Sequence, residues 1–546
     1  MAGHFEKALK AHKAGDFATA EKAYKKALRT DPDAFAAQIN LSTLYMSSGR
    51  MEQANRMLEK LSDAHPDNAT VWFNYANSCK GVGKVQEALR AYGEAVRIDP
   101  EQVNAWFNLG NTHAETGAYE EAIAAYERAL HYDPNEAALL NNYANALKET
   151  GRWDDALQVY IRASQRDPGN PELLNNLGYA LEKKLNPEEA LNCYEAAIRL
   201  KPDFPEAFTN MGLTYLNGDD LQAAAACFSH AITLDETFSK AHAHLAFVHM
   251  KAGEYAEGWR RYWQRENRET GLYALCNVPV DMQLPNTLVG VRVLLLREQG
   301  IGDELFFLRF APELKRRGAE VAYNASAKLA PLLAASGLVD AVVGDDAITS
   351  YRADYRIPIG DLPHLLNLPG PAQTFSPEIA VDPARLERLE ATLAEPDLPK
   401  IGIAWRAGVG ANRREIALEA FVELLQGLPL HVVVMQRDPT EAELHRLRDA
   451  FEHLTDLSAC HDDMEDLAAL LTLLDDYVAV DNTAVHFCGV LGRPCRLLLQ
   501  RGYDFRWCKD NPQPWYPSVV AYDASDNAKL RQTIRSIRQV FNKSAR

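Results

Sequence analysis

A short polar segment near the end of the chain carries residue types that suit anion binding. The segment VDNTAVHF, residues 480–487, follows an apolar run typical of a buried strand and begins a helical pattern of small residues. The first N–H groups of a helix are unpaired and lie at the positive end of its dipole, so they bind anions. Asp481 or Asn482 would cap this helix. Thr483 would add a hydroxyl group to the first turn, with His486 one turn further along. The alternative is an ordinary capped helix in which His486 is a structural histidine.

A second candidate segment is EQGIGDELFF, residues 298–307, which follows a predicted strand. Gly300 and Gly302 would let the backbone pass close to a ligand, because glycine has no Cβ. Asp303 would then lie at the edge of a cleft. The alternative is that Asp303 only caps the following helix.

Cationic and amide side chains follow two further predicted strands. Arg406 ends the strand KIGIAW, and its guanidinium group is suited to pair with phosphate or with a sugar carboxylate. Arg413 and Arg414 are candidates for the same role, and exposed surface arginines are the default alternative. Gln436 and Arg437, at the end of LPLHVVVMQR, are candidates for contact with a nucleotide.

Alternating strands and helices would position these residues. Continuous apolar runs predict buried strands within residues 291–296, 400–405, 428–436, 470–482 and 492–499. Amphipathic helical patterns separate them. We therefore expect a linker at 273–290, one Rossmann-like half at 291–385 and a second Rossmann-like half at 386–546. A cleft between the strand ends of two such halves is where open α/β sheets bind ligands.

The first half of the chain repeats with a period of 34 residues. A pair ending in Pro recurs from Asp31-Pro32 to Lys201-Pro202, and an alanine recurs from Ala20 to Ala224. A small residue where two helices touch, a bulky residue beside it and a closing Pro describe a helical hairpin. The pattern matches the tetratricopeptide repeat in period and in consensus. Eight frames fit residues 1–272; Leu185 replaces the glycine of the sixth, and the eighth is degenerate.

Asparagine recurs at one position of six successive frames, and more asparagines follow one helical turn later. Asn is a mediocre helix former, so local propensity does not explain this choice. In this repeat family the position faces the inner groove, where an amide can pair with the backbone of an extended peptide. The alternative is inheritance, because repeats copied from one ancestor share residues without selection. The predicted peptide-binding row is Asn40, Asn74, Asn77, Asn108, Asn111, Asn142, Asn145, Asn176 and Asn210.

Composition argues against several classes of protein. A formal net charge of −17 disfavours sequence-independent binding to nucleic acid or to anionic membranes. The eight cysteines form no C-x-x-C pair, so neither a disulfide framework nor a zinc site is predicted. The N-terminus lacks the apolar core of a signal peptide, and no apolar run reaches the ~18 residues that span a bilayer. We expect a cytoplasmic protein with no nucleic-acid partner and no membrane insertion.

The α/β region resembles the glycosyltransferase-B (GT-B) superfamily. Its GIGD turn and its VDNTAVHFCGVLGRP segment are most similar to bacterial heptosyltransferase-like domains. An α/β domain that follows tetratricopeptide repeats is a layout similar to that of bacterial flagellin glycosyltransferases, which attach nonulosonic acids to Ser or Thr. The same layout is similar to that of protein O-GlcNAc transferases. The expected fold class is an α-superhelix of tetratricopeptide repeats followed by an α/β GT-B domain made of two Rossmann-like halves. The carboxylate-x-carboxylate metal motif of the other glycosyltransferase fold is not identified between the strands, which fits a metal-independent mechanism without a cofactor.

The resemblance also implies roles for individual residues. It places Thr483 and His486 beside the phosphates of a nucleotide-sugar donor, with Asp481 in capping or in contact with the ribose. The role of general base falls on Asp303, with Glu304 as the alternative carboxylate. The donor-binding set is Gly300, Gly302, Arg406, Gln436, Asp481, Asn482, Thr483, His486 and Arg506.

The expected function is that of a protein O-glycosyltransferase. By resemblance, the donor is a CMP-activated nonulosonic acid and the acceptor is Ser or Thr of flagellin, held by the repeats. Three alternatives remain open: a non-catalytic adaptor with an inactive glycosyltransferase-like domain, a transferase that acts on a saccharide acceptor, and one that uses a UDP-sugar.

Overall fold

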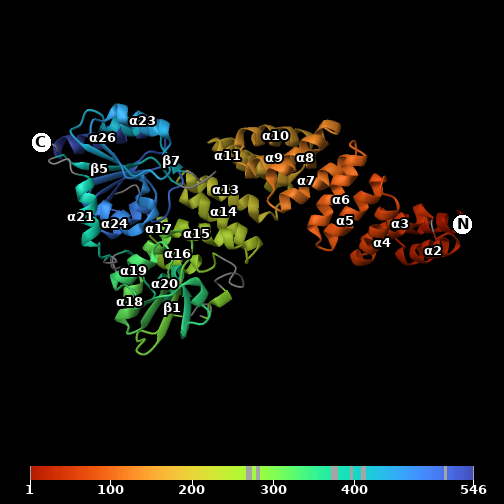
Figure 1. Ribbon diagram of the computed structural model, residues 1–546, viewed down its shortest axis with the longest axis horizontal. Coiled ribbons are helices and arrows are strands. Elements are labelled where there is room, and N and C mark those ends of the chain that lie inside the picture. Colours follow the sequence, from red (N-terminus) through yellow and green to blue (C-terminus); the bar gives the residue numbers. More distant parts are fainter. Residues whose placement is uncertain are drawn as a thin grey trace. The chain divides into compact units, whose positions relative to one another are not determined.

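The computed structural model of the protein (Figure 1) describes residues 2–32, 34–265, 274–277, 283–368, 370–371, 379–393, 398–407, 414–508 and 513–544. The chain divides into two compact units, Met1–Pro202 and Asp203–Arg546. The first unit contains helices α1–α12, and the second contains α13–α16 followed by two parallel sheets. The predicted limit of the repeat domain, residue 272, is the point where the 34-residue period ends. The boundary between the two compact units, after Pro202, instead reflects which elements pack together.

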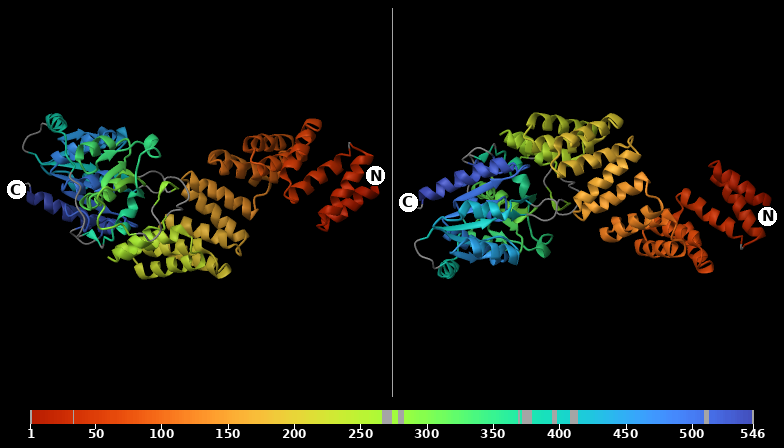
Figure 2. Two further views of the ribbon diagram at one scale, coloured as in Figure 1. Left: turned by 90° about the horizontal axis from the view of Figure 1, so that it is seen from below. Right: turned by 90° about the horizontal axis from the view of Figure 1, so that it is seen from above.

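The helices of the first unit form antiparallel hairpins, which confirms the repeat prediction. Each odd-numbered helix packs against the next helix, and neighbouring hairpins stack side by side (Figure 2). The bounds are α1 Ala2–Lys13, α2 Phe17–Thr30, α3 Phe35–Ser47, α4 Met51–Ala64, α5 Ala69–Gly81, α6 Val85–Ile98, α7 Val103–Glu115, α8 Tyr119–Tyr132, α9 Ala137–Glu149, α10 Trp153–Arg166, α11 Pro171–Lys183 and α12 Pro187–Leu200.

The 34-residue pattern arises from close packing inside each hairpin. The recurrent alanines are fully buried, and so are the bulky residues four positions after them, namely Tyr24, Leu58, Tyr92, Tyr126, Tyr160, Tyr194 and Phe228. On α7, Gly110 lies directly against the ring of Tyr126: a Cβ at Gly110 would come within 2.5 Å of Cε1. The small residue of one helix thus leaves the space that the large residue of the paired helix fills.

The turn inside each hairpin needs a left-handed backbone. Gly151 meets this need with a φ of 80°. Leu185 takes the equivalent place in the sixth repeat with a φ of 59°, and its side chain is exposed. A left-handed conformation costs an L-residue about 1–2 kcal/mol. The packing of α11 against α12 therefore sets the shape of this turn, whichever residue occupies it.

The second unit begins with two more hairpins. Their helices are α13 Pro205–Asn217, α14 Leu221–Leu234, α15 Ser239–Lys251 and α16 Tyr255–Tyr262. Met250, Trp259 and Tyr262 are buried in the same hydrophobic core as the first sheet. This shared core explains why the last repeats group with the α/β region.

The first sheet has the order β3-β2-β1-β4, and all of its strands are parallel. The strand predicted at 291–296 is confirmed by β1, where Leu294 pairs with Ala322 on one side and Arg356 on the other. The bounds are β1 Arg292–Leu296, α17 Ile301–Leu308, α18 Ala311–Arg316, β2 Glu320–Asn324, α19 Ala330–Ser336, β3 Ala341–Val342, β4 Tyr355–Pro358 and α20 Leu362–Leu365.

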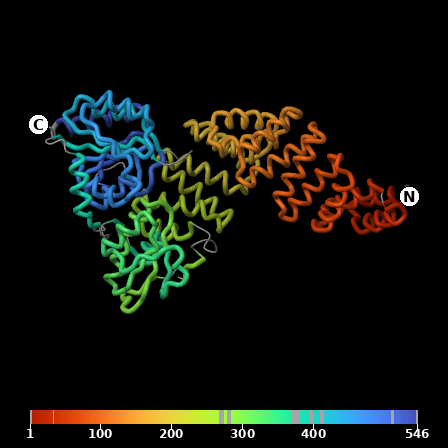
Figure 3. Tube along the Cα trace, viewed as in Figure 1, coloured from red at the N-terminus to blue at the C-terminus, as the bar shows by residue number. Residues whose placement is uncertain are grey.

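The second sheet has six parallel strands in the order β12-β11-β10-β5-β8-β9. In the Cα trace (Figure 3), its lobe is blue and the lobe of the first sheet is green. The bounds are α21 Pro383–Thr392, β5 Lys400–Ala404, β6 Arg406–Ala407, β7 Arg414–Glu415, α22 Leu418–Leu425, β8 His431–Val434, α23 Glu441–Ala450, β9 Leu454–Asp456, α24 Met464–Leu473, β10 Asp476–Val480, α25 Thr483–Val490, β11 Cys495–Leu499, β12 Val519–Asp523 and α26 Asn527–Ser544. The strands predicted at 400–405, 428–436 and 492–499 are confirmed.

The segment predicted as a strand at 470–482 is divided between two elements. Its first residues end α24, and the strand β10 begins only at Asp476. None of the helices in the described ranges combines the length and the apolar character needed to cross a bilayer.

Replacing Gly110 with Ala is expected to lower the free energy of unfolding by about 1–3 kcal/mol, because the new methyl group overlaps the buried Tyr126 ring. The control is Gly93→Ala in α6, where a Cβ meets no neighbouring atom within 4 Å and alanine should add about 0.5–1 kcal/mol. Urea unfolding of the full-length protein, followed by circular dichroism, measures both changes. A stabilising Gly110→Ala substitution would contradict the packing described above.

Candidate functional site

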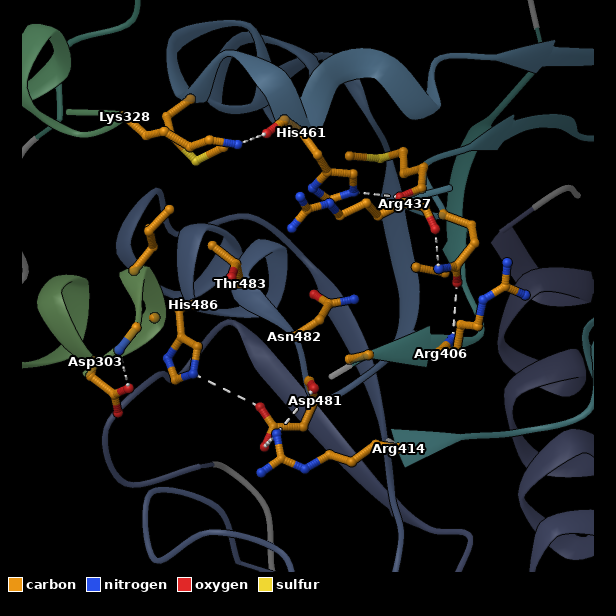
Figure 4. Close-up of a pocket in the computed structure, with 18 of the residues that line it drawn as sticks. Asp303, Lys328, Arg406, Arg414, Arg437, His461, Asp481, Asn482, Thr483 and His486 are labelled. Carbon is orange, nitrogen blue, oxygen red and sulfur yellow. Dashed lines mark hydrogen bonds and ion pairs between the residues drawn. The ribbon is translucent and has the colours of Figure 1, made fainter. Parts of the chain in front are cut away.

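A cavity of about 710 Å³ lies among the loops that follow the strands of the two sheets (Figure 4). Its walls include Gly300–Asp303 after β1, Lys328 after β2, Met435–Asp438 after β8 and Asp481–Thr483 after β10. Ala404, Arg406 and Ala407 line it at the end of β5. A cavity of this size holds a small molecule, and strand carboxyl ends are where open α/β sheets bind ligands.

Asp303 lines this cavity from the first turn of α17. Its Oδ2 accepts a hydrogen bond from the N–H of Gly300 at 3.1 Å, so Asp303 does cap the helix. Its Oδ1 lies 2.6 Å from the Nη1 atom of Arg506. The capping alternative is therefore present in the structure together with a position at the cavity wall.

Gly302 allows α17 to approach α25 closely. A Cβ at Gly302 would come within 2.8 Å of Cδ2 of His486, which is 5% exposed. His486 Nδ1 lies 3.2 Å from the hydroxyl of Tyr516, and its Nε2 lies 3.8 Å from Asp481. Burial, reinforced by the nearby charge of Arg506, lowers the pKa of His486 well below its ordinary value. The imidazole at the cavity wall is therefore neutral.

Asn482, rather than Asp481, caps helix α25. The side-chain oxygen of Asn482 accepts from the N–H of Val485 at 3.1 Å, and its nitrogen donates to the hydroxyl of Tyr477. Thr483 is the first helical residue and lines the cavity. The positive end of the α25 helix dipole therefore faces the cavity that Thr483 and His486 line, the two residues predicted to bind phosphate.

Asp481 forms an ion pair with Arg414, with 2.9 Å between Oδ2 and Nη1. Burial raises the pKa of Asp481, and the charge of Arg414 opposes that rise. Arg413, the neighbouring candidate, lies outside the described residues.

Arg506 comes from the segment after β11 and is held by two carboxylates. It contacts Asp504 at 2.7 Å and Asp303 at 2.6 Å. Burial alone would lower the pKa of Arg506, but Asp504 and Asp303 raise it well above the ordinary value. Arg506 is therefore a permanent cation that links the two α/β halves at the cavity.

Arg406 and Gln436 line the cavity, yet both are engaged within the protein. The Oε1 of Gln436 accepts from the backbone N–H groups of Trp405 and Arg406, at 3.0 and 2.9 Å. The guanidinium of Arg406 pairs with Glu443. These contacts tie the end of β5 to the segment after β8.

Glu304, the alternative carboxylate, is not among the residues that line the cavity. It is 1% exposed and accepts hydrogen bonds from the hydroxyl of Tyr323 and from the N–H of Ser326, at 2.8 and 3.2 Å. Burial raises the pKa of Glu304. The structure thus brings Asp303 and the whole predicted donor-binding set to one cavity, while Glu304 packs in the first half.

Lys328 and His461 are among the cavity residues that were not predicted from the sequence. Lys328 donates to the carbonyl of His461 at 3.2 Å, and His461 Nε2 lies 2.6 Å from the carbonyl of Met435. Burial lowers the pKa of His461, so this imidazole is also neutral. Lys328 lies in an ordinary helical pattern, and no local signal marks it, because its position depends on β2 lying beside β1.

The described lining of the cavity carries more positive than negative charge. It includes five cations, Lys328, Arg406, Arg414, Arg437 and Arg506, and three carboxylates, Asp303, Asp438 and Asp481. Arg437 is 67% exposed along its side chain and lies 3.6 Å from Asp438. Within the described ranges, no cluster of three or more His, Cys, Asp or Glu could hold a metal ion. Glu443 and Asp504 lie outside this lining and pair with Arg406 and Arg506. Lys328, Arg437 and the N-terminus of α25 are therefore the groups that favour an anionic ligand.

The asparagine row lies on the first helices of the hairpins, and its members are partly exposed. Asn40 donates to the carbonyl of Ala36 in its own helix. In the central hairpins the asparagines bond to one another, as with Asn108 and Asn77 at 3.0 Å.

Comparison with known proteins identifies the repeats. A family model described as tetratricopeptide repeat matches residues 175–237, and one described as the C-terminal domain of cilia and flagella-associated protein 70 matches residues 2–203. Protein FlbA of Caulobacter vibrioides is 26% identical over 310 residues, which cover 51% of this chain and 50% of FlbA. The chain therefore spans about half the length of this curated relative.

Solved structures with similarity are repeat proteins. YrrB, whose structure is described as a tetratricopeptide repeat protein with an unusual peptide-binding site, has a TM-score of 0.31 and 24% identity, covering 34% of this chain and 95% of YrrB. A tetratricopeptide repeat protein from Parabacteroides merdae has a TM-score of 0.36 and 19% identity, covering 45% of this chain and 98% of that one. The helical hairpins, together with the tetratricopeptide repeat model that matches residues 175–237, support a repeat superhelix in the N-terminal half, as predicted.

Replacing Gly302 with Ala is expected to cost about 1–3 kcal/mol of unfolding free energy, because its methyl group would overlap His486. Gly300→Ala is the matched control in the same turn. Its nearest atom would lie at an ordinary 3.6 Å, so its cost should stay below about 1 kcal/mol. Chemical denaturation of both variants tests the contact. Equal losses would show that α17 and α25 do not depend on this glycine.

Proposed function

We propose that the protein is a nucleotide-sugar-dependent protein O-glycosyltransferase and that its two sheets are the Rossmann-like halves of a GT-B domain. The observation that carries the proposal is the cavity at the strand ends, where Lys328 and Arg437 line the same space as the N-terminus of α25. A nucleotide-sugar brings phosphate groups that match this charge.

The donor phosphates are proposed to bind at Thr483 and His486. The hydroxyl of Thr483 and the first N–H groups of α25 would donate to phosphate oxygens, and the neutral His486 would add a hydrogen bond. Lys328 and Arg437 line the same cavity (Figure 4) and would supply further positive charge. Charge on the leaving phosphate is then stabilised by side chains and the helix dipole, and we propose that no metal is required.

Asp303 is the proposed general base. Its carboxylate would take the proton of an acceptor Ser or Thr hydroxyl, whose oxygen attacks the anomeric carbon. The bond between that carbon and the phosphate oxygen breaks, and its electron pair leaves with the nucleotide. Arg506 holds Asp303 at the cavity wall, while Asp504 holds Arg506.

The repeats are proposed to bind the polypeptide acceptor. Repeat arrays present extended concave surfaces, and this one carries a row of amide side chains. Flagellin as acceptor and a CMP-activated nonulosonic acid as donor are proposed from the resemblance of the layout to bacterial flagellin glycosyltransferases.

Flagellin co-expressed with the wild-type protein and a donor-synthesis system is expected to gain the mass of one or more sugars. Asp303→Asn should reduce transfer by roughly 100-fold or more, because it removes the proton acceptor. Asp438→Asn, an exposed carboxylate of the same cavity, is the control and should retain transfer. Intact-mass spectrometry measures the transfer, and calorimetry with CMP and UDP verifies that both variants still bind nucleotide.

Absence of added mass with every CMP- and UDP-sugar tested, together with no binding of either nucleotide, would overturn the proposal. Sugar transfer to a saccharide but not to flagellin would leave the donor site in place and change the acceptor.

A non-catalytic adaptor is the second candidate, because both carboxylate oxygens of Asp303 are engaged, by Gly300 and by Arg506. It predicts that Asp303→Asn leaves the biological phenotype unchanged.

A further inference from the structure

Three buried tyrosines hydrogen bond to asparagines of the amide row. The hydroxyl of Tyr92 donates to Oδ1 of Asn77 at 2.5 Å, and the hydroxyl of Tyr126 donates to Oδ1 of Asn111 at 2.7 Å. The third pair is Tyr160 with Asn145, at 2.6 Å. In each pair the tyrosine follows the asparagine by fifteen residues, from the second helix of the hairpin to the first.

The tyrosines are rigid and remain protonated. Each ring is about 1% exposed, and the ring of Tyr126 packs directly on Gly110. Burial raises the pKa of Tyr92 to about 12 and also raises the pKa of Tyr126 and of Tyr160. A protonated phenol at a fixed place donates its hydrogen, so it holds the amide oxygen toward the hairpin core and turns the amide nitrogen away.

In the first two pairs the next repeat uses the same oxygen, whereas Asn176, which follows Asn145, donates to Asn141 at 3.0 Å instead. Nδ2 of Asn108 donates to Oδ1 of Asn77 at 3.0 Å, and Nδ2 of Asn142 donates to Oδ1 of Asn111 at 2.8 Å. An amide oxygen has two lone pairs, and here one takes the tyrosine and the other takes the next asparagine. The NH₂ groups of Asn77 and Asn111 then remain to donate, whereas Asn108 and Asn142 present oxygens that accept.

The arrangement is confined to the central hairpins, α5–α10. Elsewhere the residue fifteen positions before the bulky one is not asparagine, namely Leu9, Thr43, Tyr179 and Leu213. Inheritance alone does not explain this coincidence, because the tyrosine and the second asparagine occur together in three hairpins while Tyr24 and Tyr194 lack the asparagine.

We propose that Tyr92, Tyr126 and Tyr160 are positioning residues that set the polarity of the amide row for a polypeptide main chain. Along an extended chain, N–H donors alternate with C=O acceptors. Along the oriented row, amide oxygens that accept alternate with NH₂ groups that donate, so each main-chain group can find a partner. Side chains of the ligand play no part in this recognition, so the partner is an extended or unfolded segment. The proposal rests on the proposed role of the repeats in holding a polypeptide acceptor.

The test uses the full-length protein and the flagellin of the same organism as the probe. The triple change Tyr92→Phe, Tyr126→Phe and Tyr160→Phe keeps the buried rings and removes the hydroxyl groups. We expect the Kd for flagellin to rise about tenfold or more, in line with the loss of several hydrogen bonds. Tyr24→Phe is the matched control, because its hydroxyl contacts His12 instead of an asparagine, and it should bind as the wild type does.

A second readout separates positioning from mere stability. A synthetic flagellin peptide with alternate backbone nitrogens methylated lacks half of its N–H donors, and wild-type protein should bind it more weakly than the unmodified peptide. This difference should shrink in the tyrosine triple variant, because its amides no longer have a fixed polarity. Circular dichroism confirms folding, and the individual change Tyr126→Phe replaces the triple variant if that does not fold.

The outcomes distinguish the two levels of the hypothesis. Normal flagellin binding by the tyrosine variant, with loss of binding after Asn108→Ala and Asn142→Ala, would overturn the positioning role and leave the groove in place. Normal binding by both sets would overturn the acceptor role of the repeats themselves. Sugar transfer measured in parallel reports on the cavity independently of either result.

Discussion

The guanidinium group of Arg506 is the contact on which the candidate site depends. Arg506 belongs to the second α/β half, and it forms ion pairs with Asp504 of that half and with Asp303 of the first half. Removing one partner from a largely buried ion pair costs about 3–5 kcal/mol, because the remaining charge is left without compensation. The close approach of Gly302 to His486 lies beside this ion pair, and one hydrophobic core contains residues of both sheets.

A second buried ion cluster joins the last repeat to the cavity wall. Arg265, just beyond α16, pairs with Asp361 at 2.7 Å and with Glu298. Glu298 immediately precedes Gln299, which has a φ of 55° and donates to the hydroxyl of Tyr262. The glycine segment of the cavity therefore starts from residues that the last repeat helix holds. The last repeat helices and the wall of the cavity therefore pack together within one compact unit.

The sequence predicted the parts of this protein that depend on local or periodic patterns. The hairpins were predictable from Ala20 and its equivalents at 34-residue spacing, and β1 and β5 from continuous apolar runs. The start of α25 was predictable because a polar segment interrupts an apolar one. Contacts across long separations were not predictable. No local sequence pattern indicates that Asp303 pairs with Arg506 or that Lys328 reaches the cavity. The choice between Asp303 and Glu304 depends on how α17 is rotated about its own axis, which decides which carboxylate faces the cavity.

The turn at Leu185 shows how much variation the array tolerates. Its left-handed backbone persists without glycine because the helices on either side impose it. Each hairpin interacts mainly with its immediate neighbours, so stability in such arrays is approximately additive along the chain. Whole units can therefore be gained, lost or altered outside α5–α10 while the central amide row keeps its geometry. Length and ligand recognition can thus evolve separately in this protein, with the reach of the array changing while the surface that recognises a main chain stays the same.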